Sequence, residues 1–337
     1  MATVLAGVLR YASGVSQVLA FVVATIALAG LAWVVSFATE QVGQRFGPAI
    51  TGVMQSTLGN LPEFFVVIFA LNAHQLVVAQ TAILGSILVN ALLVLGLVIV
   101  AGALRERDGL MRFSPRLPND TATLLLLATF IIVLIGLATA THDPASHHTK
   151  GISIIGAVAI LIVYGLWVHG YLRSDTRPEG EAESARVSIT TSVVLLSVAG
   201  VASAFVSDWF VHALQPTIDT LHISEAFAGL VIVAIAGNAV ENVAGIVLAI
   251  KGRSDLAISV VKNSVAQIAA FLYPLLVIVS LLTATTLTFA IDPIYIGALF
   301  GTAVIVWQIT GDGEASVFEG AALVATFVIL GTVAAFE

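Results

Sequence analysis

Two glutamates lie deep inside long apolar stretches, and each follows a glycine-asparagine pair. The first stretch is Gly59-Asn60-Leu61-Pro62-Glu63, and the second, Gly237-Asn238-Ala239-Val240-Glu241, lies 178 positions further along the chain. A charged side chain at the centre of a bilayer costs at least about 2.5–3.5 kcal/mol, so two carboxylates at matching positions indicate a function. We expect Glu63 and Glu241 to face one another and to bind a single cation.

The similarity continues, at the same offset, into the next apolar stretch. Ser86 aligns with Ser264, and an amide follows each serine on the same helical face, Asn90 at i+4 and Gln267 at i+3. All these candidates present oxygen and none presents sulfur or imidazole, which favours a hard cation such as Ca²⁺. The predicted metal ligands are Glu63, Glu241, Asn60, Asn238, Ser86, Asn90, Ser264 and Gln267.

Both glutamates also lie where a helix is easily interrupted. Pro62 cannot donate a helical hydrogen bond, and Gly59 and Gly237 each lie four residues before a glutamate. Carbonyl groups freed there would be further ligands. The structural alternative for the glycine-asparagine pairs is close helix packing with an interhelical hydrogen bond. Two neighbouring carboxylates in the low-dielectric interior of a membrane bind protons when no metal is present. A divalent ion, in contrast, needs both carboxylates to be deprotonated. We therefore expect two protons to replace one Ca²⁺ at this site.

Composition places the whole chain in a membrane. Of its 337 residues 59% are hydrophobic and only 10% are charged, and the mean hydropathy of +1.06 is far from that of a soluble domain. The absence of cysteine excludes disulfides, thiolate metal sites and cysteine nucleophiles. A net charge of −7 argues against a nucleic-acid partner, and the oligomeric state is left open.

Ten apolar runs are long enough to cross about 30 Å of hydrocarbon as helices, which predicts an all-α, polytopic membrane protein. Lysine and arginine in the intervening loops gather on one side, ten against two, which places both termini outside the cytoplasm. The remaining lysine, Lys262, falls inside a run, and we expect it to snorkel to the cytoplasmic interface. The runs cover 17–38, 47–72, 79–104, 121–140, 151–172, 189–211, 225–250, 256–283, 291–310 and 315–335.

The helix count has a topological consequence. Five crossings separate the two helices that carry the glutamates, so the second copy is inverted in the membrane relative to the first. Inverted repeats whose interrupted helices meet near the midplane are the architecture of many secondary transporters. We predict a first five-helix repeat over 1–172, a cytoplasmic linker over 173–186 and a second, inverted five-helix repeat over 187–337.

These motifs resemble the cation/Ca²⁺ exchanger superfamily, in particular its cation/proton exchanger branch. The two glycine-asparagine-x-x-glutamate stretches are similar to that branch's signature repeats, and Gly85-Ser86-Ile87-Leu88-Val89-Asn90 and Ser264-Val265-Ala266-Gln267-Ile268 are similar to its motifs in helices three and eight. The resemblance implies Ca²⁺ bound at the centre of two inverted five-helix repeats, with proton antiport by alternating access and no enzymatic activity. It also implies no bound cofactor beyond the transported ions.

The chain also departs from this pattern. Asn263-Ser264-Val265, preceded by Lys262, replaces the usual glycine-serine-serine, which leaves the ligand geometry of the second half open. Related sodium/calcium exchangers carry hydroxyl side chains before the glutamate where this chain has Gly59, Asn60, Gly237 and Asn238, which favours protons over sodium. The eukaryotic N-terminal extension is not seen, so we expect a prokaryotic plasma membrane.

Two alternatives to Ca²⁺/H⁺ exchange remain at this point. One is Na⁺/Ca²⁺ exchange within the same superfamily. The other is an intramembrane hydrolase, although neither a His-Glu-x-x-His pair nor a Gly-x-Ser-x-Gly elbow is present.

Overall fold

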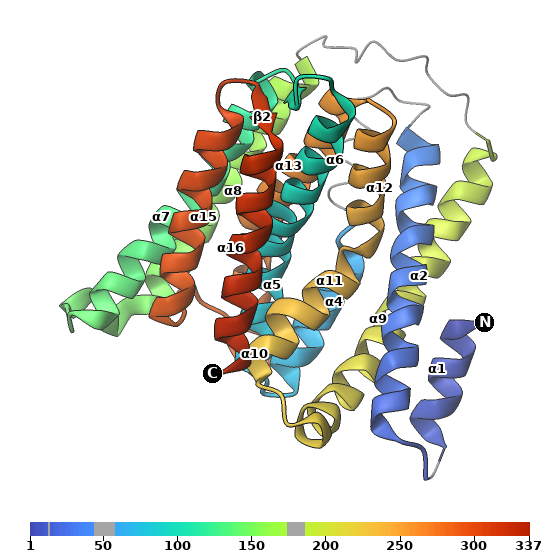
Figure 1. Cartoon of the computed structure of the whole chain (residues 1–337). Helices are drawn as coiled ribbons and strands as arrows, with labels where there is room; N and C mark the ends of the chain where they lie inside the picture. The colour runs from blue at the N-terminus through green and yellow to red at the C-terminus, as the bar shows by residue number, and fades with distance from the viewer. Residues whose placement is uncertain (13, 44–57, 174–185) are drawn as a thin grey trace.

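The computed structural model describes the chain except residues 13, 44–57 and 174–185, and its described part is a bundle of long helices (Figure 1). Breaks within helices are frequent, and several spans continue through short π-helical segments. In chain order the helices are α1 (Ala2–Tyr11), α2 (Gln17–Gly43), α4 (Leu61–Asn72), α5 (Leu76–Leu88), η1 (Val89–Val94), α6 (Leu95–Arg105), α7 (Arg116–Ala140), η2 (Pro144–His148), α8 (Thr149–Arg173), α9 (Ile189–Leu221), α10 (Glu225–Phe227), η3 (Ala228–Val233), α11 (Ala234–Gly237), α12 (Ala239–Ile250), α13 (Ser254–Gln267), η4 (Ile268–Leu272), α14 (Tyr273–Val279), η5 (Ser280–Leu282), α15 (Pro293–Thr310) and α16 (Val317–Ala335).

The prediction of a polytopic membrane protein is confirmed. Within the described residues, eight helices are long and apolar enough to cross a bilayer. A helix pair, Glu225–Gly237 and Asn242–Ile250, is bent by 57° at its break and makes a ninth if the pair is counted as one span. The predicted run 47–72 is described only in its second part, where α4 is a short apolar helix, so the count of ten stays a prediction.

Element boundaries recur at the spacing seen in the sequence. The helices α4 and α12 both begin and end 178 positions apart, and so do the first residues of α5 and α13. Each of α5 and α13 then continues into a π-helical segment, η1 and η4 respectively. Such segments widen a helix by one residue per turn and are frequent at functional sites. The repeat is therefore visible in local backbone structure as well as in residue types.

Three short elements were not predicted from the sequence. The ten-residue helix α1 packs against α2 and α9, with Gly7 against the indole ring of Trp209. Two three-residue strands, β1 (Leu110–Arg112) and β2 (Glu314–Ser316), pair antiparallel, with Met111 opposite Ala315. The protein is thus not strictly all-α, because the loop between α6 and α7 is tied to the loop between α15 and α16. The strands, at three residues each, are too short for any alternation to be visible.

One end of the bundle collects the basic loops. The α6–α7, α12–α13 and α15–α16 connections all lie at the upper end in Figure 1. The Arg105 side chain donates to the Ile250 carbonyl at 2.7 Å, and the Ser114 amide donates to Asp255 at 2.6 Å, so these connections contact one another. Arg45, which the sequence assigns to the same end, lies outside the described residues. Which side of the membrane this end faces stays a prediction.

Glycines allow the backbones of helices from the two halves to approach closely. A Cβ atom added to Gly96 in α6 would lie 2.6 Å from the Gly320 carbonyl oxygen in α16, and one added to Gly320 would lie 2.7 Å from the Gly96 carbonyl. A Cβ atom added to Gly85 in α5 would similarly collide with the backbone of Leu230 in η3. Backbone atoms cannot move aside as a flexible side chain does. Small residues at helix contacts are typical of membrane bundles, where packing must replace the hydrophobic effect.

We expect Gly320→Ala to destabilise the bundle, because the new methyl group would press on the backbone of α6. Overpacking of this kind costs about 1–3 kcal/mol. Thermal unfolding of the purified protein in detergent measures the effect as a lower Tm. Gly297→Ala, in α15 with nothing within 4 Å of the new Cβ, is the matched control and should leave Tm unchanged. Equal Tm values for the two variants would contradict the close contact.

Candidate cation site

Glu63 lies in the first turn of a helix that begins inside the protein. Asn60 is the N-cap of α4, and Pro62 and Glu63 are its second and third residues. Asn238 is likewise the N-cap of α12, so Glu241 occupies the same third position there. The two caps share one backbone conformation, with φ and ψ of −87° and 11° at Asn60 and of −95° and 8° at Asn238. A carboxylate in the first turn of a helix interacts favourably with the helix dipole.

The asparagine side chains at these caps do not perform the usual capping role. An N-cap asparagine normally accepts a hydrogen bond from the backbone two or three residues later. Neither Asn60 nor Asn238 makes such a bond with its side chain. Both side chains are buried, at 4% and 2% exposure. The Asn238 amide instead donates to the Ala234 carbonyl of α11 at 2.9 Å and to groups on other helices.

Asn238 connects the two halves of the chain. Its Nδ2 donates to Glu63 Oε1 at 2.5 Å and lies 3.0 Å from Ser86 Oγ. Ser86 Oγ in turn donates to Glu63 Oε1 at 2.7 Å, and Asn90 Nδ2 donates to Asn238 Oδ1 at 2.7 Å. Four of the eight predicted ligands therefore form one network across α4, α5, η1 and the start of α12. This hydrogen bond between helices is expected for a shared site and for close helix packing alike, so the roles of the two glycine-asparagine pairs stay predictions.

Gly237 makes room for this carboxylate. A Cβ atom at this position would lie 2.9 Å from Glu63 Oε1 and 3.0 Å from its Cγ. The sequence indicated Gly237 only as a helix-breaking residue, whereas the structure adds a steric role. Ser207 of α9 was not predicted at all, and its hydroxyl lies 3.4 Å from the Pro62 carbonyl. No motif in the sequence marks this serine, because its contact depends on how α9 packs against α4.

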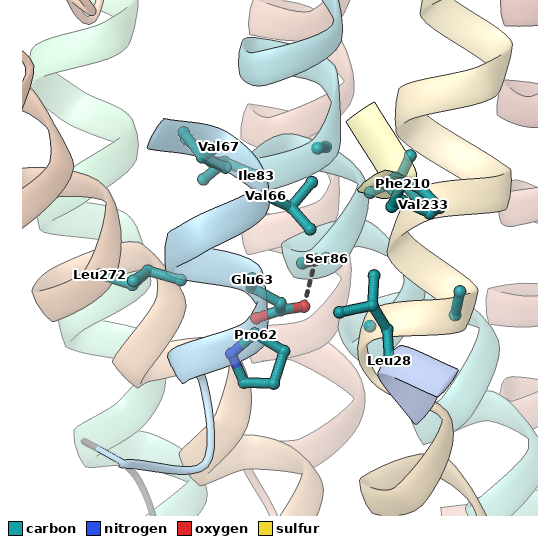
Figure 2. A pocket seen from close by; sticks show the side chains of 13 residues that line it. Leu28, Pro62, Glu63, Val66, Val67, Ile83, Ser86, Phe210, Val233 and Leu272 are labelled. Carbon is teal, nitrogen blue, oxygen red and sulfur yellow. Dashed lines mark hydrogen bonds between the residues drawn. The ribbon is translucent and has the colours of Figure 1, made fainter. Parts of the chain in front are cut away.

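A small cavity adjoins Glu63. It has room for about one water molecule, with a volume of about 20 Å³. Figure 2 shows the Glu63 carboxylate next to Ser86 and Pro62, with apolar side chains around it. These apolar groups come from α2, α4, α5, α9, η3 and η4, so the half-buried carboxylate has largely apolar neighbours. The labelled apolar residues are Leu28, Val66, Val67, Ile83, Phe210, Val233 and Leu272.

The remaining predicted ligands are placed less completely. Ser264 and Gln267 are buried in α13, at 2% and 6% exposure. The side chain of Glu241 lies outside the part of the chain whose side chains the structure describes. Whether Glu241, Asn60, Ser264 and Gln267 share an ion with Glu63 therefore stays a prediction. The helices that carry them contact one another, since α12 packs against α13 and α13 packs against η1.

The prediction for Lys262 is wrong. Its side chain does not snorkel to an interface, because it is only 2% exposed. Its ammonium nitrogen instead lies 3.2 Å from Thr310 Oγ1 at the end of α15. Thr310 lies 48 positions away in the sequence, so no local pattern indicates that Lys262 contacts it. Without that contact, the sequence pattern favoured the cytoplasmic membrane interface for this side chain.

The network can present oxygen to a cation after one side-chain rotation. As described, the amide hydrogens of Asn238 point toward Glu63 and Ser86, and the Asn90 Oδ1 atom is buried with no hydrogen-bond partner among the described residues. A half-turn of an asparagine amide exchanges a donor for an acceptor. Carboxylate, amide and hydroxyl oxygens then form the type of ligand set that suits a hard divalent ion.

Comparisons with known proteins agree with this geometry. Residues 16–171 and 191–335 match the family described as sodium/calcium exchanger protein. A vacuolar calcium ion transporter of Schizosaccharomyces pombe is 31% identical over 319 residues, which cover 92% of this chain and 77% of the relative. A Ca(2+)/H(+) antiporter of Aphanothece halophytica is 28% identical over 337 residues, covering 94% and 89%. The solved structure of native YfkE superimposes with a TM-score of 0.82 at 26% identity, over 99% of this chain and 96% of that one.

We expect Gly237→Ala to weaken cation binding, because the methyl group would displace the Glu63 carboxylate by a few tenths of an ångström. A loss of about 3- to 30-fold in Ca²⁺ affinity corresponds to roughly 0.7–2 kcal/mol. Isothermal titration calorimetry on the purified variant measures it directly. Gly30→Ala in α2, where a Cβ meets nothing within 4 Å, is the control. Affinity equal to wild type in Gly237→Ala would show that the carboxylate does not need this space.

Proposed function

The chain belongs to the sodium/calcium exchanger protein family, and from this premise we propose that it exchanges Ca²⁺ for protons across a membrane. The family resemblance seen in the sequence is confirmed. Its members are membrane transporters, so the hydrolase alternative is wrong. Within the family, the observation that carries the proposal is the contact between Glu63 and Asn238. This contact joins the two glycine-asparagine-x-x-glutamate stretches in a single oxygen-rich network.

Protons are favoured over sodium as the exchanged ion. The relative from Aphanothece halophytica is named a Ca(2+)/H(+) antiporter and matches along 94% of this chain. In this chain, glycine and asparagine stand where sodium-coupled exchangers have hydroxyl side chains, at 59–60 and 237–238. The amide hydrogens of Asn238 instead contact the carboxylate. Na⁺/Ca²⁺ exchange is the second candidate, and the flux experiment below separates the two.

The proposed mechanism is competition between two protons and one Ca²⁺ for the same acids. Glu63 and Glu241 bind the metal when deprotonated and bind protons when the metal leaves, which keeps the loaded site near neutral in both states. Two five-helix repeats, 1–172 and 187–337 joined by the linker 173–186, would present the site to each side in turn. The matching bounds of α4 and α12 support this division. So does the bent span that places Asn238 at its break.

The proposal includes an orientation. The arginine-rich end that contains β1 and β2 would face the cytoplasm, with both termini on the opposite side. The relatives include a vacuolar calcium ion transporter and a bacterial Ca(2+)/H(+) antiporter, so they do not decide between these membranes.

Flux measurements on reconstituted vesicles test the coupling ion. We expect ⁴⁵Ca²⁺ uptake to follow an imposed pH gradient and to be unaffected by a sodium gradient at constant pH. Protein-free vesicles are the control for leak. Uptake driven by sodium alone would replace the proton assignment with Na⁺/Ca²⁺ exchange, and uptake driven by neither gradient would overturn the proposed function.

Neutralising the central glutamates tests the site. We expect Glu63→Gln and Glu241→Gln each to reduce proton-driven Ca²⁺ flux by at least about 100-fold, or roughly 2.8 kcal/mol, because the ion loses a charged ligand. Glu106→Gln, an exposed residue just after α6, is the matched control and should keep wild-type flux. Retained flux in a properly folded Glu63→Gln or Glu241→Gln protein would remove that residue from the site.

A further inference from the structure

A groove opens between α7 and α15, at the end of the bundle where the basic loops lie (Figure 1). Its volume of about 550 Å³ falls in the range of about 300–1,000 Å³ that is usual for small-molecule sites. The two walls belong to different proposed repeats, because α7 precedes the linker and α15 follows it. Among the described residues, none of the predicted metal ligands lines this groove. Its lining includes Asn119, Thr123, Val304, Trp307, Gln308 and Asp312.

The groove lies where two apolar spans end. Pro118–Ala140 and Pro293–Thr310 are both long and apolar enough to cross a bilayer. Asn119 is the second residue of the first span, and Asp312 comes just after the end of the second. Trp307, which is 54% exposed, is typical of this level, since tryptophan is enriched where head groups meet hydrocarbon. The groove thus faces the head-group region of a membrane, which makes a lipid its natural occupant.

An exposed apolar stripe continues from the groove along α15. Phe300, Val304 and Trp307 are all exposed, and their spacing places them on one face of the helix. The stripe runs from the groove toward the middle of the span, so an acyl chain can pack along it. A lipid whose head group fills the groove therefore keeps its chains in the membrane.

The charges around the groove favour a cation. Among the described residues of the lining Asp312 alone is charged, and within the described structure its carboxylate accepts from the Glu314 amide, at 3.2 Å. No lysine or arginine nitrogen that the structure describes lies within 4.0 Å of this carboxylate. The last carbonyl groups of α15, which ends at Thr310, have no partners within the helix and form its negative pole. The face of the Trp307 indole ring also attracts cations.

Polar side chains in the groove are free to bind a ligand. The side-chain amides of Asn119 and Gln308 and the indole N–H of Trp307 make no hydrogen bond with another described group. Each amide presents two N–H donors and one carbonyl oxygen. The donors suit phosphate oxygens, and the carbonyl oxygens suit an ammonium group. The groove can thus meet a positive and a negative group of the same ligand.

We propose that this groove binds the head group of a membrane lipid with a primary ammonium and a phosphate, as in phosphatidylethanolamine. The ammonium donates hydrogen bonds to the Asp312 carboxylate beside the Trp307 ring, and the phosphate accepts them from Asn119 and Gln308. A choline head group has no N–H donor for Asp312, and an anionic head group meets a carboxylate of like charge. Such a lipid contacts both proposed repeats, whichever ions the protein exchanges.

Lipid binding to the purified protein tests the site. Native mass spectrometry compares phosphatidylethanolamine, phosphatidylcholine and phosphatidylglycerol of identical acyl chains. We expect the ethanolamine lipid to bind at least about 3-fold more tightly than each of the others. Asp312→Asn should weaken its binding about 3- to 10-fold and remove its advantage over phosphatidylcholine, because the ammonium loses a charged acceptor. Trp307→Leu should weaken both of these lipids about 2- to 5-fold, because the ring attracts either cation.

Matched controls remove the same residue types elsewhere. Asp120→Asn changes an exposed acid next to Asn119 that does not line the groove, and Trp33→Leu changes an exposed tryptophan of α2. Both variants should bind all three lipids as the wild-type protein does. The substituted amide in Asp312→Asn keeps an oxygen that can accept from the Glu314 amide, so the turn should still fold.

Thermal unfolding in detergent separates a specific site from general solvation by lipid. Added phosphatidylethanolamine should raise the Tm of the wild-type protein, because a ligand of the folded state stabilises it, and should raise it less in Asp312→Asn. Soluble glycerophosphoethanolamine has the same head group without acyl chains. It should leave the Tm unchanged, because the contacts of the chains with α15 are lost.

Each contrary outcome has a distinct meaning. Equal affinities for the three lipids, or tighter binding of phosphatidylglycerol, would overturn the ammonium site. Unchanged binding of phosphatidylethanolamine in both Asp312→Asn and Trp307→Leu would overturn the assignment to this groove. A Tm rise with glycerophosphoethanolamine equal to that with the lipid would replace the lipid by a soluble amine. Absence of proton-driven Ca²⁺ exchange in the wild-type protein would overturn the proposed function and leave this site standing.

Discussion

The structure depends on stabilising one half-buried carboxylate in apolar surroundings. Glu63 lies among apolar side chains, so its charge must be met by protein groups. Those groups are a serine hydroxyl from the same half of the chain and an asparagine amide from the other half. Holding this amide in place requires a helix that stops at Gly237 and restarts at Ala239. The break in the span, the glycine and the capping asparagine all serve this one contact.

Much of this arrangement could be predicted from the residue types and their spacing. Charged and amide groups are so costly in a bilayer that their presence at two matching depths already indicated a shared site. This reasoning brought Glu63, Ser86, Asn90 and Asn238 together correctly. It did not show that the Asn238 amide points its hydrogens at the carboxylate, because residue type fixes the available atoms but not their orientation.

Features that arise from tertiary packing escaped prediction. Ser207 and Lys262 have partners more than 40 positions away, at Pro62 and Thr310, and nothing in the local sequence marks these contacts. The strands β1 and β2 are three residues each, too short for any alternation to be visible. Local patterns therefore predicted the long helices and the central polar groups, whereas close contacts between distant elements had to be observed.

The shared backbone conformation of Asn60 and Asn238 has a consequence for how such a site responds to its cargo. The Asn238 side chain bonds Ala234 of the preceding helix but not the first turn of α12, so its amide can turn about the terminal torsion without unwinding α12. An arriving ion can thus find acceptor atoms through motion of one planar group, on the timescale of rotamer changes rather than of domain movements. Recognition of the ion and reorganisation of the bundle become separable events, the first local and fast, the second collective and slow.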